Sequence, residues 1–288
     1  MQPITRAGVV GLGTMGRRIA GMLVRSGVTV RVFDIAGVPA ELGSTDRAEL
    51  EVAGSIEECA VDADIVFEST FESLEVKQEV LAAISGATDT VIASNTSTFR
   101  PSVLATFVQR PERFLLTHFF NPADVVPLVE VIRAPTTAEV HVQAVLDLLS
   151  RLGKRPVAVG EVEGFIANRL QAGVLREAFS LVARGIASPE DVDAVMRYGL
   201  GPRWAIAGPI GIADLGGLDV WEAVCAEIFP TLDNADAPPA SLVEHVRAGR
   251  LGAKSGSGFY DYADGRDQRL VASIQDLFTH LDAAAADG

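Results

Sequence analysis

A histidine and a glutamate stand twelve residues apart in two apolar segments of this chain. His118 lies in the segment 117–122, and Glu130 follows in a run of Leu, Val and Ile. A carboxylate bonded to one imidazole nitrogen fixes the tautomer and stabilises the imidazolium, so the other nitrogen can take a proton. An acid in an apolar strand also needs a polar partner, which a nearby histidine supplies. The pair therefore predicts a general base that acts on a hydroxyl group.

The same residue types also have structural interpretations. His118 could be a core histidine with satisfied hydrogen bonds, and Glu130 could be a charge on an edge strand. Ser97 and Asn168, which belong to polar clusters at 94–97 and 168–169, could cap turns or a helix. A catalytic interpretation therefore depends on the folded chain bringing these groups together.

A glycine turn of the dinucleotide-binding type opens the chain. The pattern G-x-G-x-x-G is formed by Gly11, Leu12, Gly13, Thr14, Met15 and Gly16, and Asp34 ends the next strand eighteen residues later. Such glycines let the backbone approach a pyrophosphate, which rests on the N–H groups of the following helix. Asp34 would accept hydrogen bonds from the adenosine ribose and repel a 2′-phosphate. We therefore expect NAD rather than NADP, with a structural glycine turn in another α/β protein as the alternative.

Strand and helix patterns alternate through the first part of the chain. Strands are expected at 8–13, 28–34, 64–69, 90–94, 114–119, 126–132 and 155–159, and helices at 14–26, 75–85, 101–108 and 136–152. This alternation is typical of a parallel, doubly wound sheet with helices on both faces. We therefore predict an α/β fold, with a Rossmann-type NAD-binding domain at residues 1–162.

After Gly164 the patterns are helical only. Helices are expected at 165–184, from Ser188 onward, and at 217–229, 240–248 and 269–284. Ser188 and Pro189 form a typical helix start, with acidic residues directly after them. The sequence thus predicts that an all-helical C-terminal domain, residues 163–288, follows the sheet domain.

Composition excludes several classes of function. The chain has 288 residues, is 48% hydrophobic and carries a net charge of −14, which disfavours nucleic acid and anionic membrane surfaces as partners. No apolar run has the length of a membrane span, and no secretion signal is evident. The two cysteines form no CxxC, and no His/Cys cluster predicts a metal site. We expect a cytoplasmic protein without a metal.

Several motifs in the right order carry a resemblance to a known family. They occupy 11–16, 71–77, 94–97, 118–122, 128–132, 164–169 and 251–260, and so extend over nearly the whole chain. The chain resembles the 3-hydroxyacyl-CoA dehydrogenases. This resemblance implies NAD-dependent oxidation of a 3-hydroxyacyl thioester, a role in fatty acid metabolism, and a homodimer built with the helical domain.

The resemblance also implies a role for each matching residue. His118 corresponds to the general base and Glu130 to the carboxylate that orients it, while Ser97 and Asn168 correspond to residues that hold the substrate's oxygens. Positions that contact the nicotinamide end of NAD are matched by Glu72, Lys77, Ser97, Asn121 and Lys254. Without the resemblance, the two lysines would be interpreted as surface residues.

Two segments depart from the family pattern. The segment 35–54 is short, and Arg47 is its only basic residue, where the family has a longer helical excursion with lysines for coenzyme A. The segment 199–205, which contains Arg203 and Trp204, resembles the corresponding segment of relatives that oxidise free hydroxy acids such as gulonate. A free hydroxy acid, carnitine-like compounds included, or a carrier-bound hydroxyacyl group is therefore the alternative substrate.

Two other classes of protein share part of these patterns. The 3-hydroxyisobutyrate dehydrogenases share the glycine turn but rely on a lysine in the interdomain helix, and the segment 164–184 contains none. A nucleotide-binding structural protein without turnover would not need the acid–base residues. Both interpretations are disfavoured against a thioester or hydroxy acid dehydrogenase.

Overall fold

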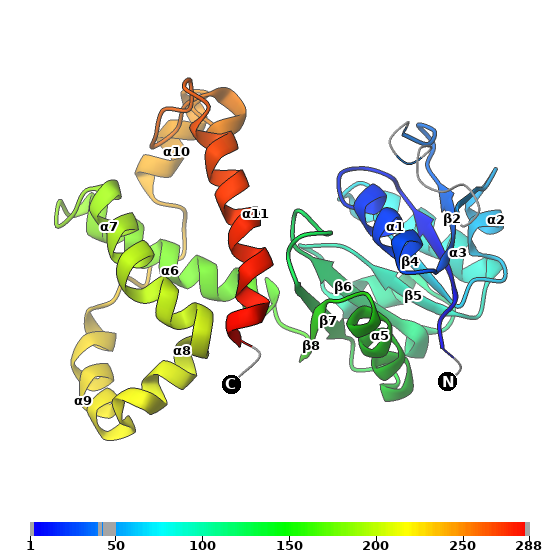
Figure 1. Ribbon diagram of the computed structural model, residues 1–288, viewed down its shortest axis with the longest axis horizontal. Coiled ribbons are helices and arrows are strands. Elements are labelled where there is room, and N and C mark those ends of the chain that lie inside the picture. The colour runs from blue at the N-terminus through cyan, green and yellow to red at the C-terminus, as the bar shows by residue number, and fades with distance from the viewer. Residues whose placement is uncertain (1–2, 40–41, 43–49, 286–288) are drawn as a thin grey trace. The chain divides into compact units, whose positions relative to one another are not determined.

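The computed structural model describes residues 3–39, 42 and 50–285 of the chain. The chain divides into two compact units, Met1–Arg169 and Leu170–Gly288 (Figure 1). Arg47, the basic residue of the short segment 35–54, lies outside the described residues.

Unit 1 is built on one sheet with the strand order β3-β2-β1-β4-β5-β6-β7-β8. The strands are β1 (Arg6–Val10), β2 (Thr29–Phe33), β3 (Leu50–Val52), β4 (Ile65–Glu68), β5 (Val91–Ser94), β6 (Phe114–Phe119), β7 (Leu128–Arg133) and β8 (Arg155–Gly160). Every strand predicted from the sequence is present. The edge strand β3 was not predicted, because its three residues are largely exposed and carry no buried apolar pattern.

The sheet departs from the expected parallel arrangement at one place. Strands β6 and β7 pair antiparallel, whereas the other neighbours in the sheet are parallel. A parallel connection needs a crossover of about a dozen residues or more. Only residues 120–127 join β6 to β7, which is too short for a crossover. The chain therefore reverses direction, and β7 pairs antiparallel with β6.

Helices cover both faces of this sheet, as Figure 1 shows. They are α1 (Gly16–Arg25), α2 (Ile56–Ala60), α3 (Leu74–Ala87), α4 (Pro101–Leu104) and α5 (Glu139–Arg151). Apolar residues of α1 and α5 pack in one core cluster, and those of α2, α3 and α4 pack in a second one. Because both faces are covered, β4, β5 and β6 are buried along their whole length. The doubly wound fold class is confirmed.

The regular elements of unit 2 in the part that the structure describes are helices, joined by loops that contain isolated β-bridges at Gly252, Ser257 and Asp261. Its helices are α6 (Phe165–Ala183, which starts in unit 1), α7 (Pro189–Val195), α8 (Gly201–Gly216), α9 (Leu218–Ile228), α10 (Ala240–Arg247) and α11 (Arg266–Ala285), with a π-helical turn at Met196–Leu200. Ser188 caps α7 through a complete capping box, as its sequence predicted. Helix α8 was not predicted, because its Gly- and Pro-rich sequence resembles a loop. Non-helical backbone at Gly208 accommodates Pro209 within it.

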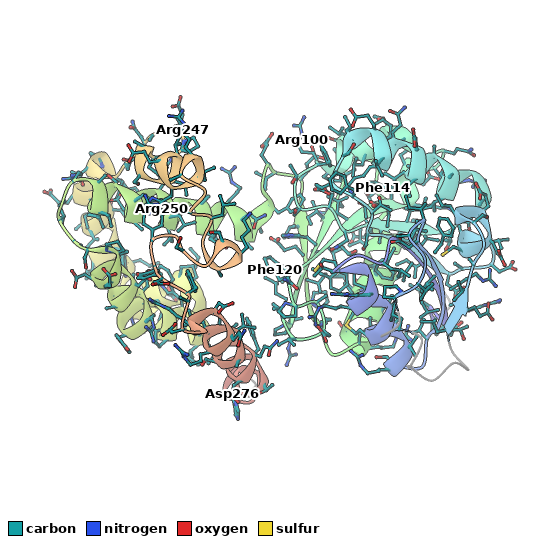
Figure 2. All side chains as sticks on the ribbon, turned by 90° about the horizontal axis from the view of Figure 1, so that it is seen from above. Arg100, Phe114, Phe120, Arg247, Arg250 and Asp276 are labelled. Carbon is teal, nitrogen blue, oxygen red and sulfur yellow. The ribbon has the colours of Figure 1, made fainter. Side chains whose placement is uncertain are left out.

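The two units differ in how well their side chains are covered. Figure 2 shows Phe114 within the sheet unit, where it is fully buried, while Arg247, Arg250 and Asp276 extend from unit 2. Among the described side chains at 170–280, none is buried. Large apolar residues such as Ile210 and Leu215, each 80% exposed, therefore have little cover within this unit.

Candidate active site

The antiparallel pairing of β6 and β7 brings the histidine and the glutamate together. His118 and Glu130 are directly opposite each other in the register, so their side chains project from the same face of the sheet. The Nδ1 atom of His118 lies 2.8 Å from Oε2 of Glu130. With Nδ1 held by the carboxylate, Nε2 is the ring nitrogen that can exchange a proton with a substrate.

The imidazole is enclosed by apolar rings. His118 is 5% exposed, and its ring centroid lies 4.6 Å from that of Phe120 and 5.2 Å from that of Phe165. This packing fixes the plane of the ring and keeps bulk water away from the pair. Phe119, by contrast, faces the core and packs against Phe67.

Glu130 also holds the start of a helix. Its Oε1 accepts hydrogen bonds from the backbone N–H groups of Ile166 (2.9 Å) and Ala167 (3.0 Å), in the first turn of α6. Burial alone would raise the pKa of Glu130. The hydrogen bonds from His118, Ala167 and Ile166 together outweigh it, so the pKa lies below the ordinary glutamate value. The carboxylate is therefore ionised at neutral pH and can stabilise a protonated imidazole.

The glycine turn lies between the end of β1 and the start of α1. Gly11 has a left-handed φ of 91°, and a Cβ added there would lie 2.6 Å from the carbonyl oxygen of Ser69. A Cβ on Gly16 would lie 1.8 Å from the carbonyl oxygen of Gly11. The protein's own packing therefore requires the first and third glycines.

Gly13 differs from both of these glycines. A Cβ built on it would have no atom within 4 Å, and its φ is not left-handed. The residue lines a cavity of about 680 Å³ together with Thr14 and Met15. Open space above a glycine that the fold does not require fits a bound pyrophosphate, so these residues suit the cofactor that the motif predicts.

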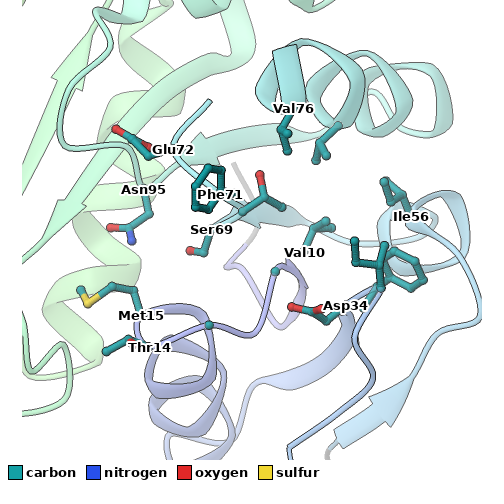
Figure 3. A pocket seen from close by; sticks show the side chains of 16 residues that line it. Val10, Thr14, Met15, Asp34, Ile56, Ser69, Phe71, Glu72, Val76 and Asn95 are labelled. Atoms are coloured by element: carbon teal, nitrogen blue, oxygen red, sulfur yellow. The ribbon is translucent and has the colours of Figure 1, made fainter. Parts of the chain in front are cut away.

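The cavity has two distinct ends, which Figure 3 shows. Asp34 and Ile56 lie toward one end, Glu72 and Asn95 lie at the other, and Thr14 and Met15 lie along the side. Both carboxylate oxygens of Asp34 accept backbone N–H groups, from Leu12 (2.6 Å) and from Ala36 (2.8 Å). These bonds hold Asp34 at the glycine turn, where each oxygen keeps a second lone pair for a ribose hydroxyl.

At the other end of the cavity, Glu72 joins the loop after β4 to the loop after β5. Its Oε1 accepts hydrogen bonds from the N–H groups of Ser97 (3.2 Å) and Thr98 (3.1 Å) and from the hydroxyl of Thr96. The amide oxygen of Asn95 accepts the N–H of Phe119, next to His118. The cavity end, the Ser97 loop and the histidine are therefore linked within one unit.

The lysine predicted to contact NAD is buried. Lys77 is 1% exposed, and its ammonium lies 3.0 Å from both carboxylate oxygens of Glu68, which is fully buried at the end of β4. Sequence reasoning missed Glu68. The available signal was an acid in an otherwise apolar strand, which for Glu68 is the last residue of the strand and for Glu130 an interior one.

The remaining site residues lie at different places. Asn168 is in the first turn of α6, one residue beyond the Ala167 amide that Glu130 binds. Asn121 is exposed and directly follows Phe120 in the connection between β6 and β7. Lys254 belongs to unit 2, in the short 3-10 helix Ala253–Ser255, and its assignment to the site stays a prediction.

Two features are absent from the described residues. No group of three or more His, Cys, Asp or Glu side chains within them could hold a metal ion. No helix in that part of the chain is long and apolar enough to cross a membrane.

Comparison with known proteins identifies the family. The model of the 3-hydroxyacyl-CoA dehydrogenase NAD-binding domain matches residues 44–162, and the model of the C-terminal domain of the same family matches residues 164–262. The chain belongs to the 3-hydroxyacyl-CoA dehydrogenase family. It is an NAD-dependent oxidoreductase that acts on a secondary alcohol.

Curated relatives of this dehydrogenase extend over nearly its full length. The 5-formyl-3-hydroxy-2-methylpyridine 4-carboxylate 5-dehydrogenase of Mesorhizobium japonicum is 32% identical over 93% of this chain and 94% of its own. The 3-hydroxybutyryl-CoA dehydrogenase of Mycobacterium tuberculosis is 35% identical over 90% of this chain and 99% of its own.

Solved structures give the same two groups of relatives. A crystal structure of the 5-formyl-3-hydroxy-2-methylpyridine 4-carboxylic acid 5-dehydrogenase, described as an NAD⁺-dependent dismutase, has a TM-score of 0.87 at 30% identity and covers 96% of both chains. The (S)-3-hydroxybutyryl-CoA dehydrogenase of Ralstonia eutropha has a TM-score of 0.72 at 34% identity, covering 91% of this chain and all of the other.

Proposed function

We propose that this dehydrogenase oxidises a 3-hydroxyacyl thioester, of the 3-hydroxyacyl-CoA or 3-hydroxybutyryl-CoA type, to the 3-oxoacyl thioester. The observation that carries the proposal is the 2.8 Å contact between His118 and Glu130 on adjacent strands. Relatives named 3-hydroxybutyryl-CoA dehydrogenase, 34% and 35% identical to this chain, support the thioester.

In the proposed mechanism, His118 is the general base. Its Nε2 would take the proton of the 3-hydroxyl, and NAD held in the cavity would supply the hydride acceptor for the carbon that bears this hydroxyl. Glu130 holds the ring in one orientation and stabilises the imidazolium that forms. Ser97 and Asn168 hold the substrate's oxygens by hydrogen bonds. In the reverse direction, His118 returns the proton to the ketone.

The cavity residues bind the cofactor in this proposal. The backbone from Gly11 to Gly16 would hold the pyrophosphate, and Asp34 would accept hydrogen bonds from the adenosine ribose. Glu72, Ser97 and Asn121 serve the nicotinamide end, and Lys254 is assigned to it by the resemblance. Residues 1–162 form the NAD-binding domain, and residues 163–288 form the substrate and dimerisation domain of a cytoplasmic homodimer.

A second candidate substrate is a free hydroxy acid. Two observations favour it: the segment 35–54 is short, and the pyridine carboxylate dehydrogenase is 32% identical over 93% of this chain. That relative's name describes a small aldehyde with its own carboxylate and no thioester, so it supports a free acid over a thioester. The proton-accepting role of His118 would be the same for either substrate, because both present a hydroxyl on a carbon that loses hydride.

A substrate panel tests the proposal. Purified enzyme would be mixed with NADH and, in separate assays, with acetoacetyl-CoA, a carrier-bound acetoacetyl group or free acetoacetate. In a further assay it would be mixed with NAD⁺ and a free pyridine aldehyde carboxylate, whose oxidation would form NADH. We expect NADH absorbance to fall fastest with acetoacetyl-CoA. Turnover of a free acid without turnover of any thioester would replace the first candidate by the second.

A further inference from the structure

The connection between β6 and β7 carries part of the candidate site. Its residues 120–127 directly follow the strand of His118, and the ring centroid of Phe120 lies 4.6 Å from that of the imidazole. Asn121, expected at the nicotinamide end, is the next residue of the chain. Ala123 is fully buried in the core cluster to which α1 and α5 contribute. The placement of this connection against the helices therefore decides where Phe120 meets the imidazole.

An ion pair joins the middle of this connection to α1. The Nη1 atom of Arg18, in the first turn of α1, lies 2.6 Å from Oδ1 of Asp124. The two residues are 106 positions apart in the chain, and their side chains are 34% and 29% exposed. Helix α1 begins at Gly16, the third glycine of the turn. The pair therefore ties the glycine-turn helix to the connection that carries Phe120.

Asp124 is an anion with cations on more than one side. Burial alone would raise its pKa, but the hydrogen bond and charge of Arg18, together with the charge of Arg25, outweigh burial, so the pKa is lowered. Two residues further along the connection, the carbonyl oxygen of Val126 accepts a hydrogen bond from the buried ammonium of Lys154 (3.0 Å). Cations from α1 and from the residue before β8 thus hold the connection at two points.

Arg18 occupies a position that does not favour a cation for the helix itself. The positive end of the helix dipole lies at the N-terminus, so a basic residue in the first turn destabilises a helix. Helix α1 has Arg17 and Arg18 there and no acidic residue. A residue that costs its own helix stability suggests a role outside that helix, and Asp124 is the partner that the structure gives it.

We infer that Arg18 and Asp124 are positioning residues: their ion pair holds the β6–β7 connection against α1 and thereby fixes the ring of Phe120 on the imidazole of His118. This inference rests on the proposed role of His118 as general base. The residues that line the cavity do not include Arg18 or Asp124. The pair therefore acts on the orientation of the base and leaves the cofactor's affinity unchanged.

The first test is Asp124→Asn, which keeps the shape of the side chain, removes its charge and leaves α1 unaltered. We expect kcat, measured with the substrate that the panel identifies, to fall about threefold to fivefold, as for the loss of a partly exposed ion pair. The NADH dissociation constant should not change. An unchanged kcat, or a weaker NADH affinity that accounts for the loss, would overturn the inference.

Variants of Arg18 test whether the two residues act as one pair. Arg18→Lys keeps a cation within reach of Asp124 and should retain kcat within about twofold, whereas Arg18→Met should lose as much as Asp124→Asn. Residues that act through one contact are not additive, so the double variant Arg18→Met/Asp124→Asn should be no slower than either single variant. Additive losses would contradict a shared role.

A spectroscopic measurement separates positioning of the base from general stability. Ring signals of the histidines would be recorded by NMR and those of His118 assigned by their absence in His118→Ala. Asp124→Asn should shift the His118 signals and leave those of His245 and His280, both in unit 2, in place. His118 signals that do not move would refute the positioning role.

Asp89→Asn is the matched control for both measurements. Asp89 pairs with Arg110 at 2.7 Å, and these residues precede β5 and β6, at the opposite end of the strands from the glycine turn. This variant should change neither kcat nor the His118 signals. The NMR measurement needs no substrate, so it tests the inference even if the substrate panel contradicts the proposed function. Failure of His118 as the base would appear separately, as an unchanged rate in His118→Ala.

Discussion

At the residue scale, His118 and Glu130 have separate tasks that their surroundings explain. The imidazole is packed between Phe120 and Phe165, while the carboxylate is bonded on one oxygen to the ring and on the other to the first turn of α6. The glutamate therefore stays charged although it is 2% exposed, and the histidine has one nitrogen for chemistry.

Replacement of His118 by Ala should remove the proton acceptor without disturbing the cofactor cavity. We expect kcat to fall by roughly 10²–10⁴, the usual contribution of a general base, while the NADH dissociation constant stays the same. His280→Gln is the matched control, because His280 is an exposed residue of α11 that lacks any assigned role. Equal rates for His118→Ala and the wild type would exclude this histidine as the base.

The lowered pKa of Glu130 predicts a pH dependence of stability. A carboxylate whose pKa is lower in the folded state stabilises the fold above its unfolded pKa, about 4.3 for glutamate. That contribution disappears as the pH falls through the folded pKa. The difference in unfolding free energy between wild type and Glu130→Gln, measured in urea, should therefore be larger at pH 7 than at pH 4. A difference independent of pH would contradict this assignment.

At the element scale, the turn between β1 and α1 combines two requirements in one motif. Gly11 and Gly16 satisfy the packing of the turn itself, whereas Gly13 faces open space in the cavity. The same three-glycine pattern therefore contains positions that serve the fold and one that serves the ligand.

Alanine substitutions separate these requirements. Gly13→Ala should fold normally, with an unchanged thermal midpoint, but bind NADH at least about tenfold more weakly, because the methyl group occupies space needed by the pyrophosphate. Gly16→Ala should fail to fold, since its Cβ would overlap the Gly11 carbonyl. Gly160→Ala, with no atom near its Cβ, is the neutral control. Normal NADH affinity in Gly13→Ala would count against a pyrophosphate at this turn.

At the scale of the whole molecule, the helical unit has an apolar surface that its own chain does not cover. No described side chain between 170 and 280 is buried, and Ile210, Leu215 and Phe229 are at least 65% exposed. A monomer rarely exposes so much apolar surface, whereas interfaces between subunits bury it. This surface supports the proposed homodimer.

Light scattering with size exclusion tests that proposal. We expect twice the chain mass of 30.4 kDa at micromolar concentration. Ile210→Asp and Leu215→Asp should each shift the equilibrium toward monomer, because an interface excludes an unpaired charge. A control substitution at an exposed polar residue, Asp276→Asn, should leave the mass unchanged. A monomeric wild type would refute the dimer.

Local sequence patterns determined the glycine turn, most strands of unit 1 and the capped start of α7. Each depends on residues close together in the chain: glycines at fixed spacing, apolar runs of strand length, and Ser188 three residues before Asp191. Patterns failed where local chemistry was ambiguous, as in β3, which is short and exposed, and in α8, whose glycines and prolines resemble a loop.

Tertiary structure alone decided how the site residues meet. The sequence named His118 and Glu130, but their contact depends on an antiparallel register that the alternating pattern did not predict. It also named Lys77, but not the fully buried Glu68, nine residues earlier, that binds its ammonium. Residue type reveals which groups can do chemistry. Which partner each group finds is decided by strand pairing and burial, because these join residues that are distant in the chain.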